Sequence, residues 1–266
     1  EKIKKNEDVR KEIQAVKKKG KEFEKKLSIR NSKLRDCKYH FGDRSGYGSE
    51  TMIFLTEGDS AGGSMVQSRD PNTQAVFALK GKPFNCFGKK LETVYTVEEL
   101  FCIMRTLDIE EDIENLRYNK VVIATDADVD GFQIRTLILT MFYRLLPSLI
   151  KMGRIYIAES PLYEITSKDK TYFAYNESEK VKILADIGDA KYSIQRSKGL
   201  GENEPDMMWQ TTMNPATRRL IRVTETDAIR TAYIFDTLLG DDLQARKEFI
   251  TENGSRYLSD IDIDDD

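Results

Sequence analysis

The chain has 266 residues, enough for one large domain or two of ordinary size, and its 39% hydrophobic and 33% charged residues describe a globular protein. Its three cysteines lack the spacing of a zinc site, which indicates reduced thiols in a cytoplasmic protein, and the apolar stretch 134–150 is broken by two arginines and a proline, which excludes a membrane span. The net charge of −3 hides a basic arm, with fifteen Lys or Arg against seven Asp or Glu in residues 1–39, and five aspartates in residues 260–266.

Residues 1–30 are predicted to form one basic, amphipathic helix. Direct contact of this helix with DNA is one interpretation, and a solvated helix that packs by a thin stripe is the one we favour. The chain begins inside the predicted helix without a start signal, so we expect a fragment of a longer protein, and residues 38–49 are predicted to be a loop. The apolar positions follow alternating spacings of four and three: Val9, Ile13, Val16, Gly20, Phe23 and Leu27.

Residues 50–170 are predicted to form an α/β domain, because short apolar strands alternate with helical segments, an order typical of a parallel sheet with helical crossovers. The expected strands are 52–56, 75–79, 121–125 and 154–158, and the expected helices begin at Ser60 and span 97–107 and 132–151. Residues 171–266 are predicted to be a smaller mixed or helical tail. Strands are expected near this boundary at 163–166, 171–175 and 191–195, and helices at 177–187, 205–209, 215–220, 226–239 and 242–252.

Carboxylates follow two of the predicted strands. Glu57 comes directly after the first strand, and Asp126, Asp128 and Asp130 follow the strand at 121–125. If these strands are parallel neighbours, all four side chains meet at the sheet edge where open α/β folds place their sites. Their mutual repulsion would raise each pKa unless a cation were bound, and all-oxygen ligands favour Mg²⁺ or Mn²⁺. The pattern therefore predicts metal-assisted phosphoryl transfer.

Three other interpretations of these segments are weaker. Asp126–Gly131 matches the start of a calcium-binding EF-hand loop, but position twelve would be Leu137 where a bidentate Glu is needed. Capping of the next helix explains one aspartate and not three in five residues. The spacing of Gly58 and Gly63 is that of a nucleotide P-loop, but Ser64 stands where its lysine should follow.

Basic residues near glycines are candidates for phosphate contact. Lys80 and Lys82 flank a glycine in the predicted α/β domain. This pattern is weak evidence for phosphate contact by itself, and it gains weight because it lies in the same domain as the carboxylates. Arg196 and Lys198 lie in a glycine-containing turn of the tail, for which a solvated turn and a phosphate contact are equally good interpretations. His40 is the only histidine, so the sequence argues against acid–base catalysis by histidine.

Taken together, these segments closely resemble the B-type subunit of bacterial type II DNA topoisomerases, the gyrase B and topoisomerase IV B family. The resemblance covers roughly residues 33–260, and its motifs are highly specific in this order. They are Glu57–Ser64 (EGDSAGGS), Leu79–Asn85 (LKGKPFN), Leu116–Tyr118 (LRY), Thr125–Gly131 (TDADVDG), Lys198–Glu202 (KGLGE) and Trp209–Met213 (WQTTM).

The resemblance implies a Toprim domain, an α/β fold with a parallel sheet that holds Mg²⁺, joined to the C-terminal tail of the B subunit, with residues 1–49 as the end of the preceding transducer region. It implies that Glu57 and Asp126 hold the metal at the scissile phosphate, with Mn²⁺ or Ca²⁺ able to substitute in binding. Asp128 and Asp130 would hold a second metal or water position. Glu57, Asp126 and Asp128 are then the catalytic residues, and Asp59, Lys80 and Lys82 line the cleaved DNA.

The family resemblance also implies partners. The nucleophile would be a tyrosine of the A subunit, in an A2B2 heterotetramer on double-stranded DNA, and ATP would bind only the full-length subunit. Two positions depart from the family: Gln133 stands where His is common, and Ser197 where an aromatic residue is common. The motifs do not separate gyrase from topoisomerase IV. Rival interpretations are another Toprim enzyme, a primase or nuclease, and a DNA-binding assembly module that is inactive in isolation.

Overall fold

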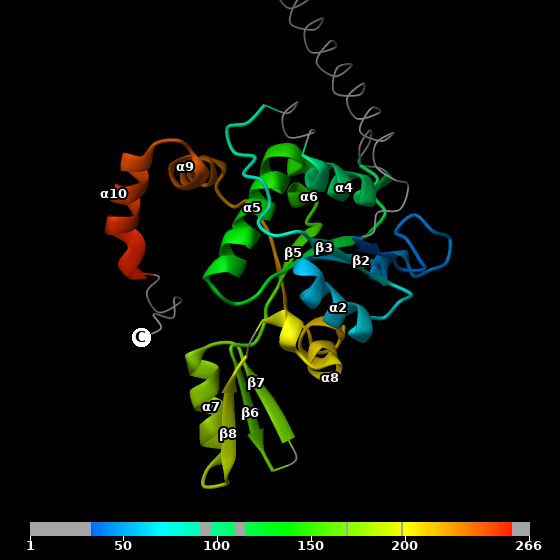
Figure 1. Ribbon diagram of the computed structural model, residues 1–266, viewed down its shortest axis with the longest axis vertical. Coiled ribbons are helices and arrows are strands. Elements are labelled where there is room, and N and C mark those ends of the chain that lie inside the picture. Colours follow the sequence, from blue (N-terminus) through cyan, green and yellow to red (C-terminus); the bar gives the residue numbers. More distant parts are fainter. Residues whose placement is uncertain (1–32, 91–96, 110–114, 169, 198, 257–266) are drawn as a thin grey trace, which may run out of the picture.

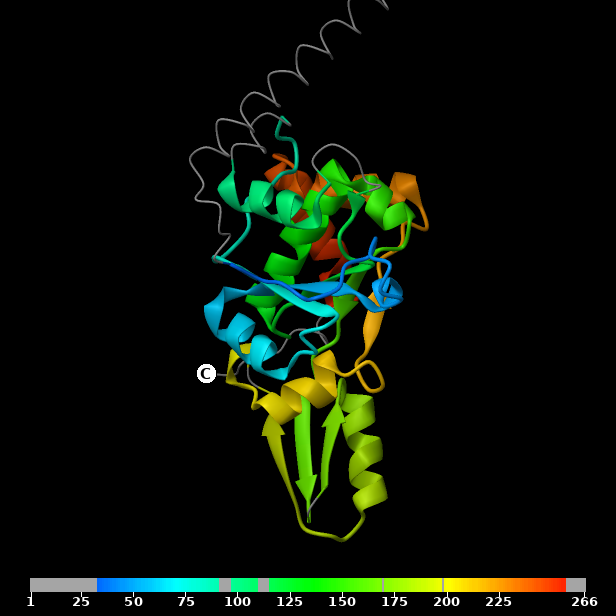
Figure 2. The ribbon, with the colours of Figure 1, turned by 90° about the vertical axis from the view of Figure 1, so that its right-hand side faces the viewer.

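The computed structural model describes residues 33–90, 97–109, 115–168, 170–197 and 199–256. The predicted basic helix and the acidic C-terminal residues lie outside this part of the chain. The described residues form two sheets, a six-stranded one with helices on both faces and a three-stranded one that projects from it (Figures 1 and 2). None of the described helices is long and apolar enough to cross a membrane.

The six-stranded sheet has the order β1-β3-β2-β4-β5-β9. Strands β3, β2, β4 and β5 run parallel to one another, and the edge strands β1 and β9 are antiparallel to β3 and β5. Strands β2 and β4 are central and buried on both faces, which explains their nearly continuous apolar sequences. The bounds are β1 Leu34–Arg35, β2 Met52–Glu57, β3 Gln74–Leu79, β4 Lys120–Ala124, β5 Ile155–Ala158 and β9 Leu220–Arg222.

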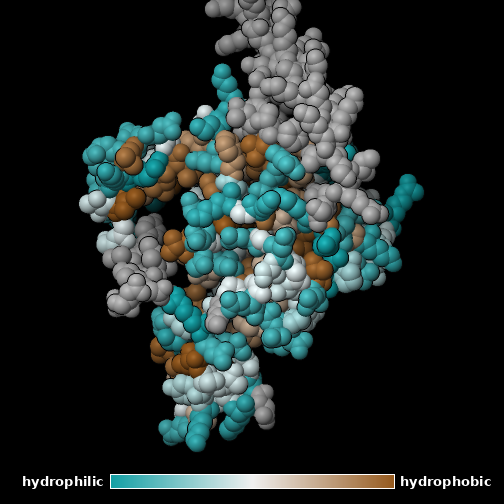
Figure 3. All heavy atoms as spheres, viewed as in Figure 1, coloured by the Kyte–Doolittle hydropathy of each residue, from teal (hydrophilic) through white to brown (hydrophobic). Residues whose placement is uncertain are grey.

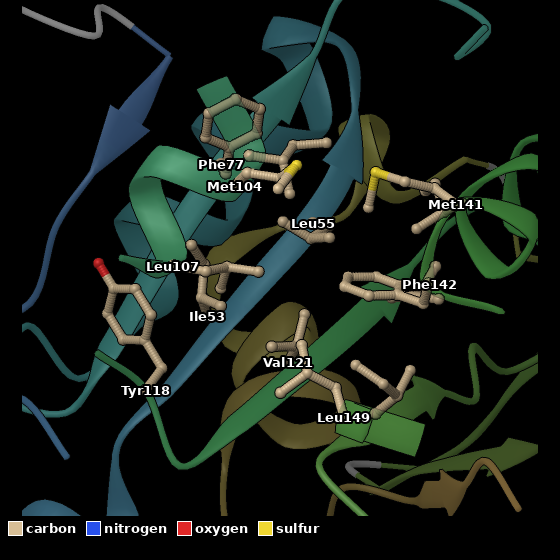
Figure 4. Packing of buried hydrophobic residues seen from close by; sticks show 14 of the residues in the cluster. Ile53, Leu55, Phe77, Met104, Leu107, Tyr118, Val121, Met141, Phe142 and Leu149 are labelled. Carbon is tan, nitrogen blue, oxygen red and sulfur yellow. The ribbon is translucent and has the colours of Figure 1, made fainter. Parts of the chain in front are cut away.

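Alternate residues of the central strands point into two separate cores. Ile53 and Leu55 face α4 (Glu98–Leu107), α5 (Val129–Leu145) and α6 (Pro147–Lys151), and Figure 4 shows this cluster around Phe142 and Leu107. Met52 and Phe54 face the other side, in a cluster that includes Met65 of α2 (Gly58–Ser68), Leu200 and Met208. Residues of the C-terminal tail therefore complete one of the two cores of the main sheet.

The three-stranded sheet has the order β7-β6-β8 and is antiparallel throughout. Its strands are β6 (Tyr163–Ser167), β7 (Lys170–Ala174) and β8 (Tyr192–Arg196), with α7 (Glu177–Ile187) between the last two. This sheet begins with β6, before the domain boundary that the sequence predicts at residue 170. The tail returns to the main sheet through β9, which pairs with β5.

The remaining tail elements are short and mostly helical. A 3-10 turn, η3, spans Leu200–Glu202, α8 spans Pro205–Met208, and the π-helical turn η4 covers Trp209–Met213. Helices α9 (Ala228–Leu239) and α10 (Leu243–Asn253) follow β9, and Phe235 of α9 stacks on Tyr143 of α5 with ring centroids 4.5 Å apart. Figure 3 shows apolar residues exposed among polar ones over these two helices, and Ile229 is 85% exposed.

Two predicted elements are wrong in detail. The helix predicted at 132–151 begins earlier, at Val129, because the side chain of Asp128 caps it. It ends at Leu145 because Pro147 cannot continue the hydrogen-bond ladder, and a separate helix starts at that proline. The helix predicted at 215–220 is a turn that leads into β9, since residues 220–222 pair with the open edge of β5 instead.

Candidate active site

The predicted pairing of the two carboxylate-bearing strands is confirmed. Strands β2 and β4 are parallel neighbours, with Thr56 opposite Ala124. Glu57 is the last residue of β2, and Asp126 follows β4 after one intervening residue, so both lie at the same edge of the sheet. Strand β3 ends at Leu79, opposite Glu57, and this register brings Lys80 to that edge as well.

The charges of this carboxylate cluster act on one another. Burial raises the pKa of the Glu57 carboxyl above its ordinary value, and the charges of Asp126, Asp128 and Asp130 raise it further, while Lys82 opposes them. Burial also raises the pKa of Asp126, against the effect of a hydrogen bond from the backbone N–H of Leu200. Among the described residues, this edge therefore carries more negative than positive charge.

Asp128 and Asp130 are exposed and have further partners. Oδ1 of Asp128 accepts a hydrogen bond of 2.6 Å from the backbone N–H of Gly131, which caps α5 at its N-terminus. The capping interpretation is thus confirmed for this one aspartate. Asp130 forms an ion pair with Lys82, with 2.8 Å between Nζ and Oδ1.

This donor set fits a divalent cation in its chemistry. It offers carboxylate oxygens and, among the described residues, an excess of negative charge, the combination that hard cations such as Mg²⁺ bind. The side chains do not form a closed cage, because the described residues contain only one trio of His, Cys or carboxylate ligand atoms within 4.8 Å of one another, and that trio lies elsewhere. Glu57 and Asp126 would hold the ion, with Asp128 beside them.

The predicted phosphate-contacting residues occupy different places. Lys80 and Lys82 are exposed beside the carboxylate cluster, and the backbone N–H of Lys80 donates to Oε1 of Glu99. Asp59 is exposed in the first turn of α2 at the same edge. Arg196 is exposed at the end of β8, and Lys198 lies outside the described residues. Gln133 lies in α5 and, with Lys82, lines a cavity of about 590 Å³ that extends to Leu239 and Arg246.

A second polar cluster lies at the opposite edge of the sheet, where the strand β4 begins. It contains Arg117 and Tyr118 of the motif LRY, to which the sequence assigned no role. Asp36 accepts hydrogen bonds from Tyr118 Oη at 2.5 Å and from the guanidinium of Arg117. His40 Nε2 lies 3.2 Å from Asp36 Oδ1 and 2.7 Å from Arg117. Cys37 completes the trio of metal-type ligand atoms with Asp36 and His40, but Arg117 already neutralises the carboxylate.

The electrostatics of this second cluster are the reverse of the first. Burial by itself would raise the pKa of Asp36, but hydrogen bonds from Tyr118 and His40 and the charge of Arg117 bring it below the ordinary value. Burial raises the pKa of the Cys37 thiol to about 12, so this cysteine is an inert thiol. The charge of Asp36 is therefore balanced within this cluster, and the cluster has a structural role.

Comparison with known proteins places the two parts of the chain. Residues 52–160 match the Toprim domain family, and residues 189–251 match the family described as DNA gyrase B subunit, carboxyl terminus. The B subunit of DNA topoisomerase 4 from Borreliella burgdorferi is 46% identical over 252 residues, which is 93% of this chain and 41% of that protein. The chain belongs to the gyrase B and topoisomerase IV B family.

Other members of the gyrase B and topoisomerase IV B family agree. The B subunit of DNA gyrase from Clostridium acetobutylicum is 40% identical over 91% of the chain and 39% of that protein. The B subunit of DNA gyrase from Halalkalibacterium halodurans is 43% identical over 87% of the chain and 36% of that protein. The chain spans about two fifths of the length of the curated relatives it matches. Gyrase and topoisomerase 4 relatives both occur in this group, at similar identity to the chain.

Proposed function

We propose that this chain is the DNA cleavage and religation half of a type II topoisomerase B subunit that works in the cytoplasm. The observation that supports this most directly is the edge where Glu57 and Asp126 lie next to Lys80 and Lys82. A carboxylate pair with raised pKa values beside exposed lysines suits a site that receives a cation and a phosphodiester together.

The protein groups would each have a distinct task. A bound Mg²⁺ would supply charge stabilisation to the 3′-oxygen that leaves during cleavage. Glu57 and Asp126 would hold the ion, and Asp128 would stand beside it while its other contact caps α5. Lys80 and Lys82, with Asp59, Arg196 and Lys198, would line the path of the DNA and set the position of the backbone.

The nucleophile would come from another polypeptide. We propose that an A subunit supplies a tyrosine, in an A2B2 assembly on double-stranded DNA, because this chain carries the charge-stabilising half of the site. Tyr118 is buried and hydrogen bonded to Asp36 at the opposite sheet edge, and burial raises its pKa, so it is unsuited to attack. ATP would act through the full-length protein.

Reconstitution tests this proposal. The chain is mixed with the A subunit of a relative, supercoiled DNA and Mg²⁺, and covalent DNA–protein adducts are trapped with detergent. Adducts on the A subunit are expected only with both proteins and Mg²⁺, and Glu57→Ala should abolish them. Glu50→Ala is the matched control, because Glu50 is an exposed carboxylate at the other edge of the sheet. Metal-dependent nicking by the chain alone would indicate a self-contained nuclease and overturn the proposal.

A further inference from the structure

The segment Gly199–Glu202 of the tail reaches into the main domain. It follows β8 of the three-stranded sheet, and its η3 turn packs against α2. The side chain of Leu200 is 2% exposed and lies in the core cluster with Phe54, Met65 and Ala124. The tail is thus fixed to the main sheet at a point next to the carboxylate cluster.

Both oxygens of the Asp126 carboxylate meet this segment. The backbone N–H of Leu200 donates a 2.7 Å hydrogen bond to Oδ1. Gly199 lies against the other oxygen, since a Cβ added there would stand 2.6 Å from Oδ2 and 3.2 Å from Cγ. Hydrogen bonding and close packing therefore act on one carboxylate from a single tail segment.

The same segment is held from its other side by α2. The carbonyl of Gly201 accepts from Ser64 Oγ at 3.3 Å and from Ser60 Oγ at 3.5 Å. A Cβ at Gly201 would lie 2.6 Å from Ser60 Oγ and 3.1 Å from the backbone nitrogen of Ala61. Two glycines on either side of a buried leucine are what this double contact requires, because only glycine lets the backbone approach so closely.

We propose that Gly199, Leu200 and Gly201 are positioning residues that fix the Asp126 carboxylate in the orientation that a divalent cation needs. The inference rests on the proposed function and extends it, because it makes the tail part of the metal site. A carboxylate fixed before binding loses less rotamer freedom when the ion arrives, so its affinity rises. Any displacement of the tail segment would then lower cation affinity.

The backbone conformation around Leu200 allows its N–H to be removed by a proline substitution. Gly199 has φ −56° and ψ 155°, a conformation that a residue before proline adopts readily, and Leu200 is the first residue of the η3 turn, where proline is tolerated. Leu200→Pro therefore deletes the donor together with the leucine side chain. Leu200→Ala deletes the side chain and keeps the donor, and it is the matched control.

Mg²⁺ binding to the purified chain, measured by titration calorimetry, is the first readout. Leu200→Pro should bind about tenfold more weakly than Leu200→Ala, as the loss of a hydrogen bond to a charged group implies. Gly199→Ala should also weaken binding by pressing on Asp126, whereas Gly63→Ala, which meets open space, should not. Equal binding by Leu200→Pro and Leu200→Ala would overturn the inference and leave the metal site standing.

The Leu200 amide resonance is the second readout and needs no metal. Its peak in an amide correlation spectrum is assigned by its loss in Leu200→Pro. We expect it to move upfield in Asp126→Asn and to stay in place in Asp128→Asn, because only Asp126 accepts this hydrogen bond. A peak unmoved by Asp126→Asn overturns the positioning role. If the peak moves but the wild-type chain binds no Mg²⁺, the proposed function fails together with the inference.

Discussion

The two ends of strand β4 carry polar clusters of opposite electrostatic character. Before the strand, Arg117 and Tyr118 satisfy Asp36 and lower its pKa. After the strand, Asp126 joins Glu57 in a cluster where burial and like charges raise both pKa values. The first arrangement stabilises the fold. The second costs stability in the absence of a cation, a cost that a chain retains where a ligand supplies the missing charge.

Glu57→Gln should produce the largest effect in the reconstituted complex. It keeps the size of the side chain and removes a carboxylate charge, so we expect cleavage to fall by at least about a hundredfold while the free energy of unfolding at pH 7 holds or rises. Adduct formation and urea denaturation measure the two quantities. A variant that cleaves normally at limiting Mg²⁺ would contradict the assignment of Glu57.

Asp36→Ala should act on stability alone. It leaves Tyr118 and Arg117 without their acceptor at a half-buried site, which should lower the free energy of unfolding by about 2 kcal/mol. Asp36→Asn keeps an acceptor for Tyr118 and should lose less. Urea denaturation gives these values, and cleavage per folded molecule should match wild type. Loss of cleavage in a fully folded Asp36 variant would break the division between the two clusters.

The two lysines beside the carboxylates should respond differently to substitution. Lys80→Ala should make the slope of log affinity for DNA against log salt shallower by about one unit, without changing Mg²⁺ affinity. Lys82→Ala should in addition change Mg²⁺ affinity, because Lys82 pairs with Asp130 and lowers the pKa of Glu57. Salt titrations of DNA binding and calorimetry separate the two. An unchanged slope for Lys80→Ala would show that Lys80 does not contact the DNA backbone and is an ordinary surface lysine.

Asp128 tests capping against metal binding. Asparagine caps a helix as well as aspartate does, so Asp128→Asn should leave the free energy of unfolding nearly unchanged, and Asp128→Ala should lower it by about 1 kcal/mol. Both should weaken Mg²⁺-dependent cleavage, since both remove the charge. Equal stability of the two variants in urea denaturation would show that the 2.6 Å contact to Gly131 contributes nothing.

The smallest effects should appear in the pH dependence of stability. The pKa of Asp36 is lowered on folding, so its stabilising contribution is present above the ordinary value of 3.8 and is lost as pH falls through the lower folded value. The pKa of Glu57 is raised above 4.5, so its destabilising contribution is present above the folded value and disappears as pH falls through it. Urea denaturation at a series of pH values measures both. The fall in the free energy of unfolding due to Asp36 should be absent in Asp36→Asn, and the rise due to Glu57 should be absent in Glu57→Gln.

Much of the α/β domain could be predicted because its signals are local. The apolar runs that become β2 and β4 are short and favour buried strands, and once the two are assumed to be parallel neighbours, Glu57 and Asp126 lie at one edge. The prediction for residues 215–220 was wrong because no local signal shows that the open edge of β5 is available to β9. Tertiary pairing overrides the helical propensity there.

The contacts of the site were harder to predict than its members. The motif KGLGE drew attention as a flexible basic turn, whereas the structure uses Gly199 and Gly201 for close approach to Asp126 and Ser60. Sequence spacing of more than seventy residues between Asp126 and Leu200 hides such a contact. Asp36 was overlooked for the same reason, since its partners Arg117 and Tyr118 are brought to it only by the register of β1 with β3 and of β4 with β2.

The pairing of β5 with β9 also governs how the chain can be cut or extended. Ala158 and Leu220 are opposite each other, and the backbone N–H of Glu159 donates to the carbonyl of Arg219 at 3.1 Å, so the stretch 159–219 leaves and re-enters through neighbouring strands. Residues 159–219 are therefore an insertion between two paired strands, and the length of this insertion does not affect the register of the main sheet. A protease nick in the β6–β7 hairpin, where Ser167 pairs with Lys170 at the end of the two strands, would leave both fragments anchored and the molecule in one piece.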